Sequence, residues 1–134
     1  MGETSGIELL ARVRAVLGTV DLDCACREKL DEALRRFEAL EQRRGLRDLI
    51  ADARAQCEQV AALLDLLREL DEIQVEDTDC GVFEELALLF EAIATAATRG
   101  AGDMRRFQAL LAAGADREAA GVARASAPVR PIGP

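Results

Sequence analysis

The 134-residue chain contains no histidine, tryptophan or tyrosine, and Lys29 is its only lysine. The absence of histidine removes the most common general base and the most common metal ligand in proteins. Neither Gly-x-Gly-x-x-Gly nor Gly-Lys-Ser/Thr occurs, so the usual phosphate-binding loops are missing. A di-metal helical bundle is excluded too, because it needs inward-facing Glu-x-x-His motifs. These absences predict a protein that is not an enzyme and that uses no cofactor.

Long hydrophobic runs are also lacking. No apolar segment approaches the roughly 20 residues that a membrane-spanning helix requires, and residues 1–6 lack the basic start and apolar centre of a secretory signal. The formal charge is −8 and the pI is about 4.6, so nucleic acids and anionic membranes would repel the chain. We therefore expect a cytoplasmic protein that binds neither nucleic acid nor membrane and whose cysteines are thiols.

Aromatic residues make up only 3% of the chain, and all of them are phenylalanine. By contrast, half of the residues are hydrophobic and 31% are charged, a composition typical of a globular protein. The core must therefore be built from leucine, valine, isoleucine and alanine, as in many helical bundles.

Apolar residues recur every three or four positions, which is the spacing of one face of an α-helix. Between residues 30 and 70 this stripe changes phase at Gly45. One straight helix cannot bury both parts of the stripe against the same neighbour, and glycine is common just after a helix end. We therefore expect an αα-hairpin that turns at Gly45. The alternative is one long helix with a local stutter, as in coiled coils.

Caps and helix breakers divide the chain further. Asp23 is one of several candidate N-caps for the second helix, and Thr78 or Asp79 can cap the fourth. Gly100–Gly102 ends the fourth helix, and Asp103 caps a short fifth one that stops at Gly114. The predicted helices cover roughly residues 5–17, 24–44, 46–72, 80–98 and 103–114.

The fold class predicted from these segments is all-α. We expect an antiparallel helical bundle of four main helices plus a short C-terminal helix and a loose tail. A single helical-bundle domain covers residues 1–114, and residues 115–134 form a flexible tail containing alanine, arginine and proline.

The four cysteines are the only residues with distinctive chemistry. Cys26, Cys57 and Cys80 fall on apolar stripes, where a cysteine is most often a small buried hydrophobe. Cys24 points away from the stripe, and we expect it to be exposed without special reactivity. A hairpin at Gly45 gathers Cys24, Cys26 and Cys80 at one end of the bundle. A thiol-based redox or metal sensor built on these three is therefore one alternative function, although Cys-x-Cys lacks the usual zinc spacing.

The helices predicted over residues 46–72 and 80–98 carry apolar arcs wider than a single neighbour covers. We therefore expect function through protein–protein contacts, as an adaptor, regulator or self-associating module, with a homodimer or another protein as partner. A further alternative, suggested by the charge alone, is an acidic decoy that binds a basic protein surface. The expected interface residues are Leu63, Leu66, Leu67, Leu70, Leu88 and Leu89.

Overall fold

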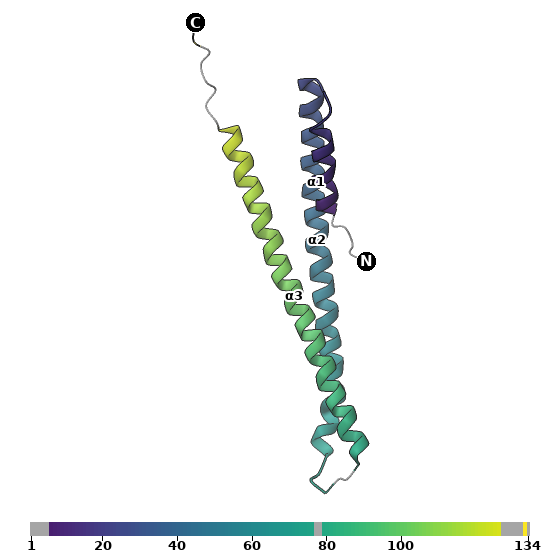
Figure 1. The fold of residues 1–134 in the computed structure, drawn as a ribbon. Helices are drawn as coiled ribbons and strands as arrows, with labels where there is room; N and C mark the ends of the chain where they lie inside the picture. The colour runs from purple at the N-terminus through teal and green to yellow at the C-terminus, as the bar shows by residue number, and fades with distance from the viewer. Residues whose placement is uncertain (1–5, 77–78, 127–132, 134) are drawn as a thin grey trace. The chain divides into compact units, whose positions relative to one another are not determined.

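The computed structural model describes residues 6–76, 79–126 and 133. Its elements are all helices: α1 (Gly6–Leu17), α2 (Cys24–Leu66), the 3₁₀ helix η1 (Leu67–Glu72) and α3 (Cys80–Ala125) (Figure 1). The all-α prediction is confirmed, but the main helices are fewer and longer than predicted. The chain divides into two compact units, Met1–Arg47 and Asp48–Pro134, which are described separately below.

The helix α2 passes through Gly45 without a turn, so the hairpin predicted there is wrong. A glycine inside a helix costs only about 1 kcal/mol relative to alanine, and the arginine, leucine, glutamate and glutamine around Gly45 are good helix formers. No described glycine has a positive φ, the conformation that ends many helices. The stripe before Gly45 lies in the first unit, where Arg14 of α1 pairs with Glu38 of α2. The stripe from residue 48 onward lies in the second unit, where Arg99 of α3 pairs with Asp52 of α2.

The helix α3 likewise passes through Gly100–Gly102 and Gly114, so the separate fifth helix is wrong. Asp103 is not an N-cap but lies inside α3. Residues 115–125, which were predicted to belong to the tail, are helical. The rest of the predicted tail lies outside the described residues, apart from Ser126 and Gly133, and the domain boundary after residue 114 stays a prediction.

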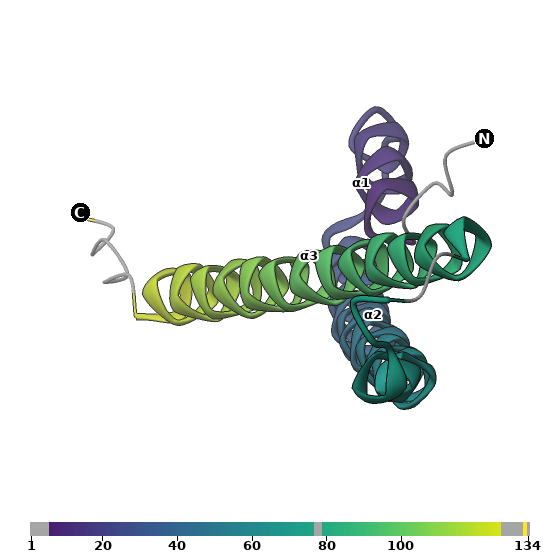
Figure 2. The same cartoon turned by 90° about the horizontal axis from the view of Figure 1, so that it is seen from below.

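In the first unit, α1 lies antiparallel to the beginning of α2 (Figures 1 and 2). Arg14 of α1 forms an ion pair with Glu38 of α2 at 3.2 Å, and Gly6 lies against the Glu41 side chain. The backbone N–H of Cys26 donates a 2.8 Å hydrogen bond to Oδ1 of Asp23, which confirms Asp23 as the N-cap of α2.

In the second unit, the end of α2, η1 and α3 form an antiparallel hairpin. Asp79 caps α3, because its Oδ1 accepts a 3.0 Å hydrogen bond from the N–H of Gly81. A Cβ added to Gly100 would lie 3.6 Å from Cβ of Gln56, so these two residues are level across the hairpin. Both helices rise by the same distance per residue and run in opposite directions, so Val60, four residues after Gln56, lies level with Ala96, four residues before Gly100.

The least exposed positions of α3 recur at alternating steps of four and three residues. Leu86 and Ala96 are 5% and 3% exposed. Along this seam the side chains change from branched and large near the start of α3 to small and polar further on. The seam residues up to the polar position are Val82, Leu86, Leu89, Ile93, Ala96, Gly100 and Asp103.

Candidate functional site

A buried polar layer crosses the α2–α3 hairpin where the seam reaches Asp103. Asp103 is 2% exposed and Gln56 of α2 is 9% exposed. Arg99 donates two hydrogen bonds to the Asp52 carboxylate, from Nε at 2.9 Å and from a terminal nitrogen at 2.8 Å. Arg106 donates a 2.9 Å hydrogen bond to Oδ1 of Asp103. Each carboxylate thus has an arginine, and the Asp52–Arg99 pair is bidentate, the strongest geometry for such a contact.

The two carboxyls of this layer have pKa values shifted in opposite directions. Hydrogen bonds from Arg99, and then one from Asp103, lower the pKa of Asp52. The hydrogen bond to Asp52, burial and the negative charge of Asp52 raise the pKa of Asp103. When Asp103 is ionised, its buried Oδ2 has no hydrogen-bond partner among the described residues. A proton on that carboxyl would let Asp103 donate a hydrogen bond to Asp52, which accounts for the opposite directions of the two pKa shifts.

The chemistry of this layer suits a structural role. A polar atom that is buried among apolar side chains without a hydrogen-bond partner lowers the stability of the fold. In any other register of α2 against α3, the Asp52–Arg99 hydrogen bonds would be lost. Gln56 or Asp103 would then lie against apolar side chains. A polar residue in a helical seam commonly specifies register for this reason. Within the described part of the chain, no group of three or more acidic, cysteine or histidine side chains could hold a metal ion.

Sequence reasoning missed the polar layer altogether. Asp103 was interpreted as the start of a helix because it follows Gly100–Gly102. The signal that could have identified it is its spacing, because Ala96, Gly100 and Asp103 continue the four–three alternation that begins at Val82. On α2, Gln56 is buried and Asp52 is half-buried.

The predicted interface leucines separate into two groups. Leu67 is 7% exposed and so belongs to the core of the hairpin, while Leu63 and Leu89 are half-buried. The exposed members are Leu66, Leu70 and Leu88, at 55%, 41% and 55%. These three surround the turn between α2 and α3.

The cysteines that were predicted to gather belong to different units of the chain. Cys24 and Cys26 lie in the first turn of α2, and Cys80 begins α3, which follows the other end of α2. The turn at Gly45 on which their grouping depended is absent. All four thiols are exposed, so the interpretation of Cys26, Cys57 and Cys80 as buried hydrophobes is wrong, whereas the exposure expected of Cys24 is confirmed.

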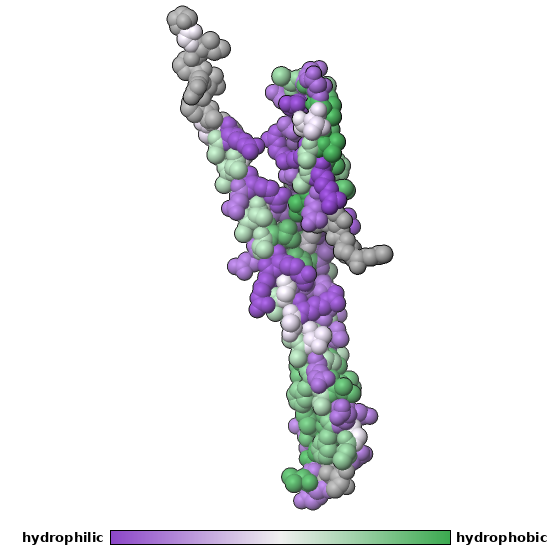
Figure 3. Space-filling model, viewed as in Figure 1, coloured by the Kyte–Doolittle hydropathy of each residue, from purple (hydrophilic) through white to green (hydrophobic). Residues whose placement is uncertain are grey.

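The hairpin tip, defined as residues 58–91, combines acidic and exposed apolar side chains. It contains eleven acidic residues and a single basic one, Arg68, so its formal charge is −10. The remaining 100 residues contain 16 basic and 14 acidic residues. Every described acidic residue of the tip is exposed. Figure 3 shows hydrophobic side chains over this end of the hairpin, with hydrophilic ones among them.

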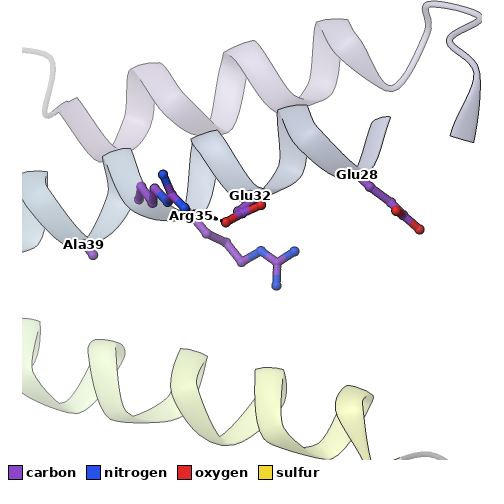
Figure 4. A pocket seen from close by; sticks show the side chains of 5 residues that line it. Glu28, Glu32, Arg35 and Ala39 are labelled. Atoms are coloured by element: carbon purple, nitrogen blue, oxygen red, sulfur yellow. Dashed lines mark hydrogen bonds and ion pairs between the residues drawn. The ribbon is translucent and has the colours of Figure 1, made fainter. Parts of the chain in front are cut away.

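A second surface feature is an open hollow on α2 in the first unit (Figure 4). Its residues include an ion pair between Arg36 and Glu32 at 2.7 Å, and both side chains are more than half exposed. Exposed pairs of this kind contribute little, so the hollow offers no concentrated charge. Its lining residues are Glu28, Glu32, Arg35, Arg36 and Ala39.

Searches of protein-family models, curated proteins and solved structures give no match to this chain. Among the described residues, none of the helices combines the length and the apolar character needed to cross a membrane.

Proposed function

We propose that this protein acts through protein–protein contact and that the hairpin tip binds a basic partner surface. The observation that carries the proposal is the presence of exposed leucines inside a segment of charge −10. Leu64 and Leu66 at the end of α2 are 53% and 55% exposed, and Leu88 of α3 is 55% exposed.

Single exposed leucines are normal on protein surfaces, but several at one end of a hairpin are not. An apolar patch rimmed by charged residues is typical of a protein interaction site. In such a site the apolar side chains supply binding free energy. The acidic rim accelerates encounter with a cationic partner and disfavours anionic ones.

The sign of the charge also argues for the kind of partner. Two tips facing each other would bring together two segments of charge −10, which repel within the screening distance of about 8 Å at physiological salt. A partner that carries leucines flanked by lysine or arginine complements both features of the tip. An amphipathic cationic helix is the simplest segment of that chemistry.

The test uses a synthetic amphipathic peptide with leucine on one face and lysine on the other, labelled for fluorescence anisotropy. We expect it to bind the full chain, and the double variant Leu66→Ser/Leu88→Ser to bind at least about 10-fold more weakly. Leu40→Ser is the matched control, because Leu40 is 62% exposed but lies in the first unit. Binding should also weaken steadily as salt increases.

Two results would contradict the proposal. One is equal binding of the peptide to the parent and to the Leu66/Leu88 double variant. The other is equal binding of a peptide of the same composition whose leucines and lysines are scrambled.

A further inference from the structure

A second apolar stripe runs along α3 beside the buried seam. It also alternates steps of four and three residues, and each member is one position beyond a seam residue. All of its members are exposed, and the four large ones are 42–53% exposed. Only one member is polar. The stripe consists of Phe83, Ala87, Phe90, Ala94, Ala97, Ala101, Met104, Gln108, Leu111 and Ala115.

This spacing is the one that a helix presents to another helix in a coiled coil. Each residue advances about 100° around an α-helix, so a stripe shifted by one position lies on a different side of α3 from the seam. The helix α2 already packs on the seam at Gly100 and Asp103. The second stripe therefore lies on a side of α3 where another helix could pack.

We propose that this other helix is α3 of a second copy of the chain, packed antiparallel. The stripe is self-complementary in one antiparallel register, in which Ala97 lies level with Ala101 of the second copy. Ala94 then lies level with Met104, and Ala87 with Leu111. Alanines thus face large residues away from the symmetry axis, except that Phe90 faces Gln108, and two alanines meet near the axis. The two-fold symmetry repeats each pairing.

The charges beside the stripe fit the same register. Glu91 and Arg105 occupy equivalent positions along one edge of the stripe, and within the described residues neither side chain forms an ion pair. In the proposed register Arg105 of the second copy lies two residues, about 3 Å along the helix axis, from the level of Glu91. The two long side chains can pair across that offset, and symmetry repeats the pair. Charge pairs at these positions set helix orientation in coiled coils. A shift of one heptad would instead pair Glu84 with Arg105.

The charge of the tip also favours the antiparallel arrangement. A parallel pair would place two segments of charge −10 side by side. The antiparallel pair separates the two tips and sets each beside the later part of a partner α3. Residues 92–125 contain five basic and three acidic residues, so that contact is attractive.

This self-association goes beyond partner binding at the tip. The stripe includes Phe83, Ala87 and Phe90 of the tip segment but neither Leu66 nor Leu88. The two proposals therefore fail separately, because a monomeric chain could still bind the cationic peptide and a dimer could fail to bind it.

The test is analytical ultracentrifugation of the full chain under reducing conditions, with helix content followed by circular dichroism. We expect a dimer at concentrations of about 0.1 mM or below. Ala97→Glu places two carboxylates at the centre of the contact and should weaken dimerisation by about 100-fold or more. Ala109→Glu is the matched control, since Ala109 is exposed on another face of α3, and it should remain dimeric.

Charge reversal then tests the register. Glu91→Arg should weaken the dimer about 10-fold, because two attractive pairs become repulsive. Adding Arg105→Glu should restore it to within about 3-fold of the parent, whereas Glu84→Arg with Arg105→Glu should not. The proposal is overturned by a monomeric parent, by Ala97→Glu behaving like Ala109→Glu, or by failure of the Glu91/Arg105 exchange to restore dimerisation.

Discussion

The polar layer and the tip belong to the same hairpin, but their charged side chains differ in pairing and in exposure. In the layer, Asp103 is buried and Asp52 is half-buried, and each carboxylate has an arginine partner. At the tip, acidic residues outnumber basic ones eleven to one, and those that the structure describes are exposed, as are several leucines. The layer pairs each carboxylate with an arginine of the same chain, although Oδ2 of Asp103 has no hydrogen-bond partner among the described residues. The tip instead leaves apolar and charged groups facing outward.

This difference separates residues that hold the hairpin from residues available to a partner. A buried, paired charge commits the helices to one register, because a shift leaves it unpaired. An exposed leucine beside exposed acids contributes little to the stability of the chain itself. Mutations in the polar layer should therefore change the stability of the hairpin, whereas mutations of exposed tip residues should change partner binding.

The largest expected effect compares two leucines of the tip that are two residues apart. Leu86 is 5% exposed and Leu88 is 55% exposed. Leu86→Ala should lower the free energy of unfolding by about 3 kcal/mol, because it leaves a cavity in the core. Leu88→Ala should change it by less than about 0.5 kcal/mol. Urea unfolding followed by circular dichroism measures both, and equal effects would show that the tip has no distinct inner and outer surface.

The second prediction concerns pH and the polar layer. Because the pKa of Asp103 is raised in the folded chain, its contribution to stability is fully present below the ordinary aspartate pKa and is lost as pH rises through the raised value. Asp103→Asn keeps the shape and supplies an N–H that can donate to Asp52. We therefore expect the variant to have a higher urea midpoint than the parent at about pH 7, and the difference to vanish in acid.

Asp116→Asn provides the control for this pH series, since Asp116 is an exposed acid on α3. Its midpoint should follow that of the parent across the range. If Asp103→Asn is instead less stable than the parent at neutral pH, the ionised carboxylate must be favourable in the layer and the inferred direction of its pKa shift is wrong.

The smallest expected effect comes from glycines inside the helices. A Cβ added to Gly100 meets only Cβ of Gln56, at an ordinary contact distance of 3.6 Å. Gly100→Ala should therefore stabilise the hairpin by about 1 kcal/mol through helix propensity. Gly6→Ala should bring no such gain, because its Cβ would meet the Glu41 side chain. Thermal unfolding of both variants checks the contrast.

Much of the local structure was predictable. The three-to-four spacing identified helices, and Asp23 and Asp79 cap α2 and α3 as expected. The errors in helix number all arose at glycines. Gly45, Gly100 and Gly114 were interpreted as helix ends, but a single glycine disfavours a helix by only about 1 kcal/mol, and long flanking segments of good helix formers outweigh it.

The candidate sites were predictable to different degrees. The wide apolar arcs predicted an interface that includes Leu66, Leu70 and Leu88; these three are exposed, and their place in an interface stays a prediction. The polar layer was not predictable, because Asp52 and Asp103 are 51 residues apart in the sequence and resemble surface acids until α2 and α3 are paired. The cysteine grouping failed with the turn at Gly45 from which it was inferred.

The sequence by itself determined that this protein is helical, that its charge concentrates in residues 58–91, and which faces of its helices are apolar. These properties depend on residue type and local spacing. Only the tertiary structure decided which helix covers which face, and therefore that Leu86 is buried while Leu88 is exposed and that Asp103 lies against Asp52. Such pairings depend on long-range packing, where a shift of one residue turns a helix by about 100° and exchanges the inner face for the outer one.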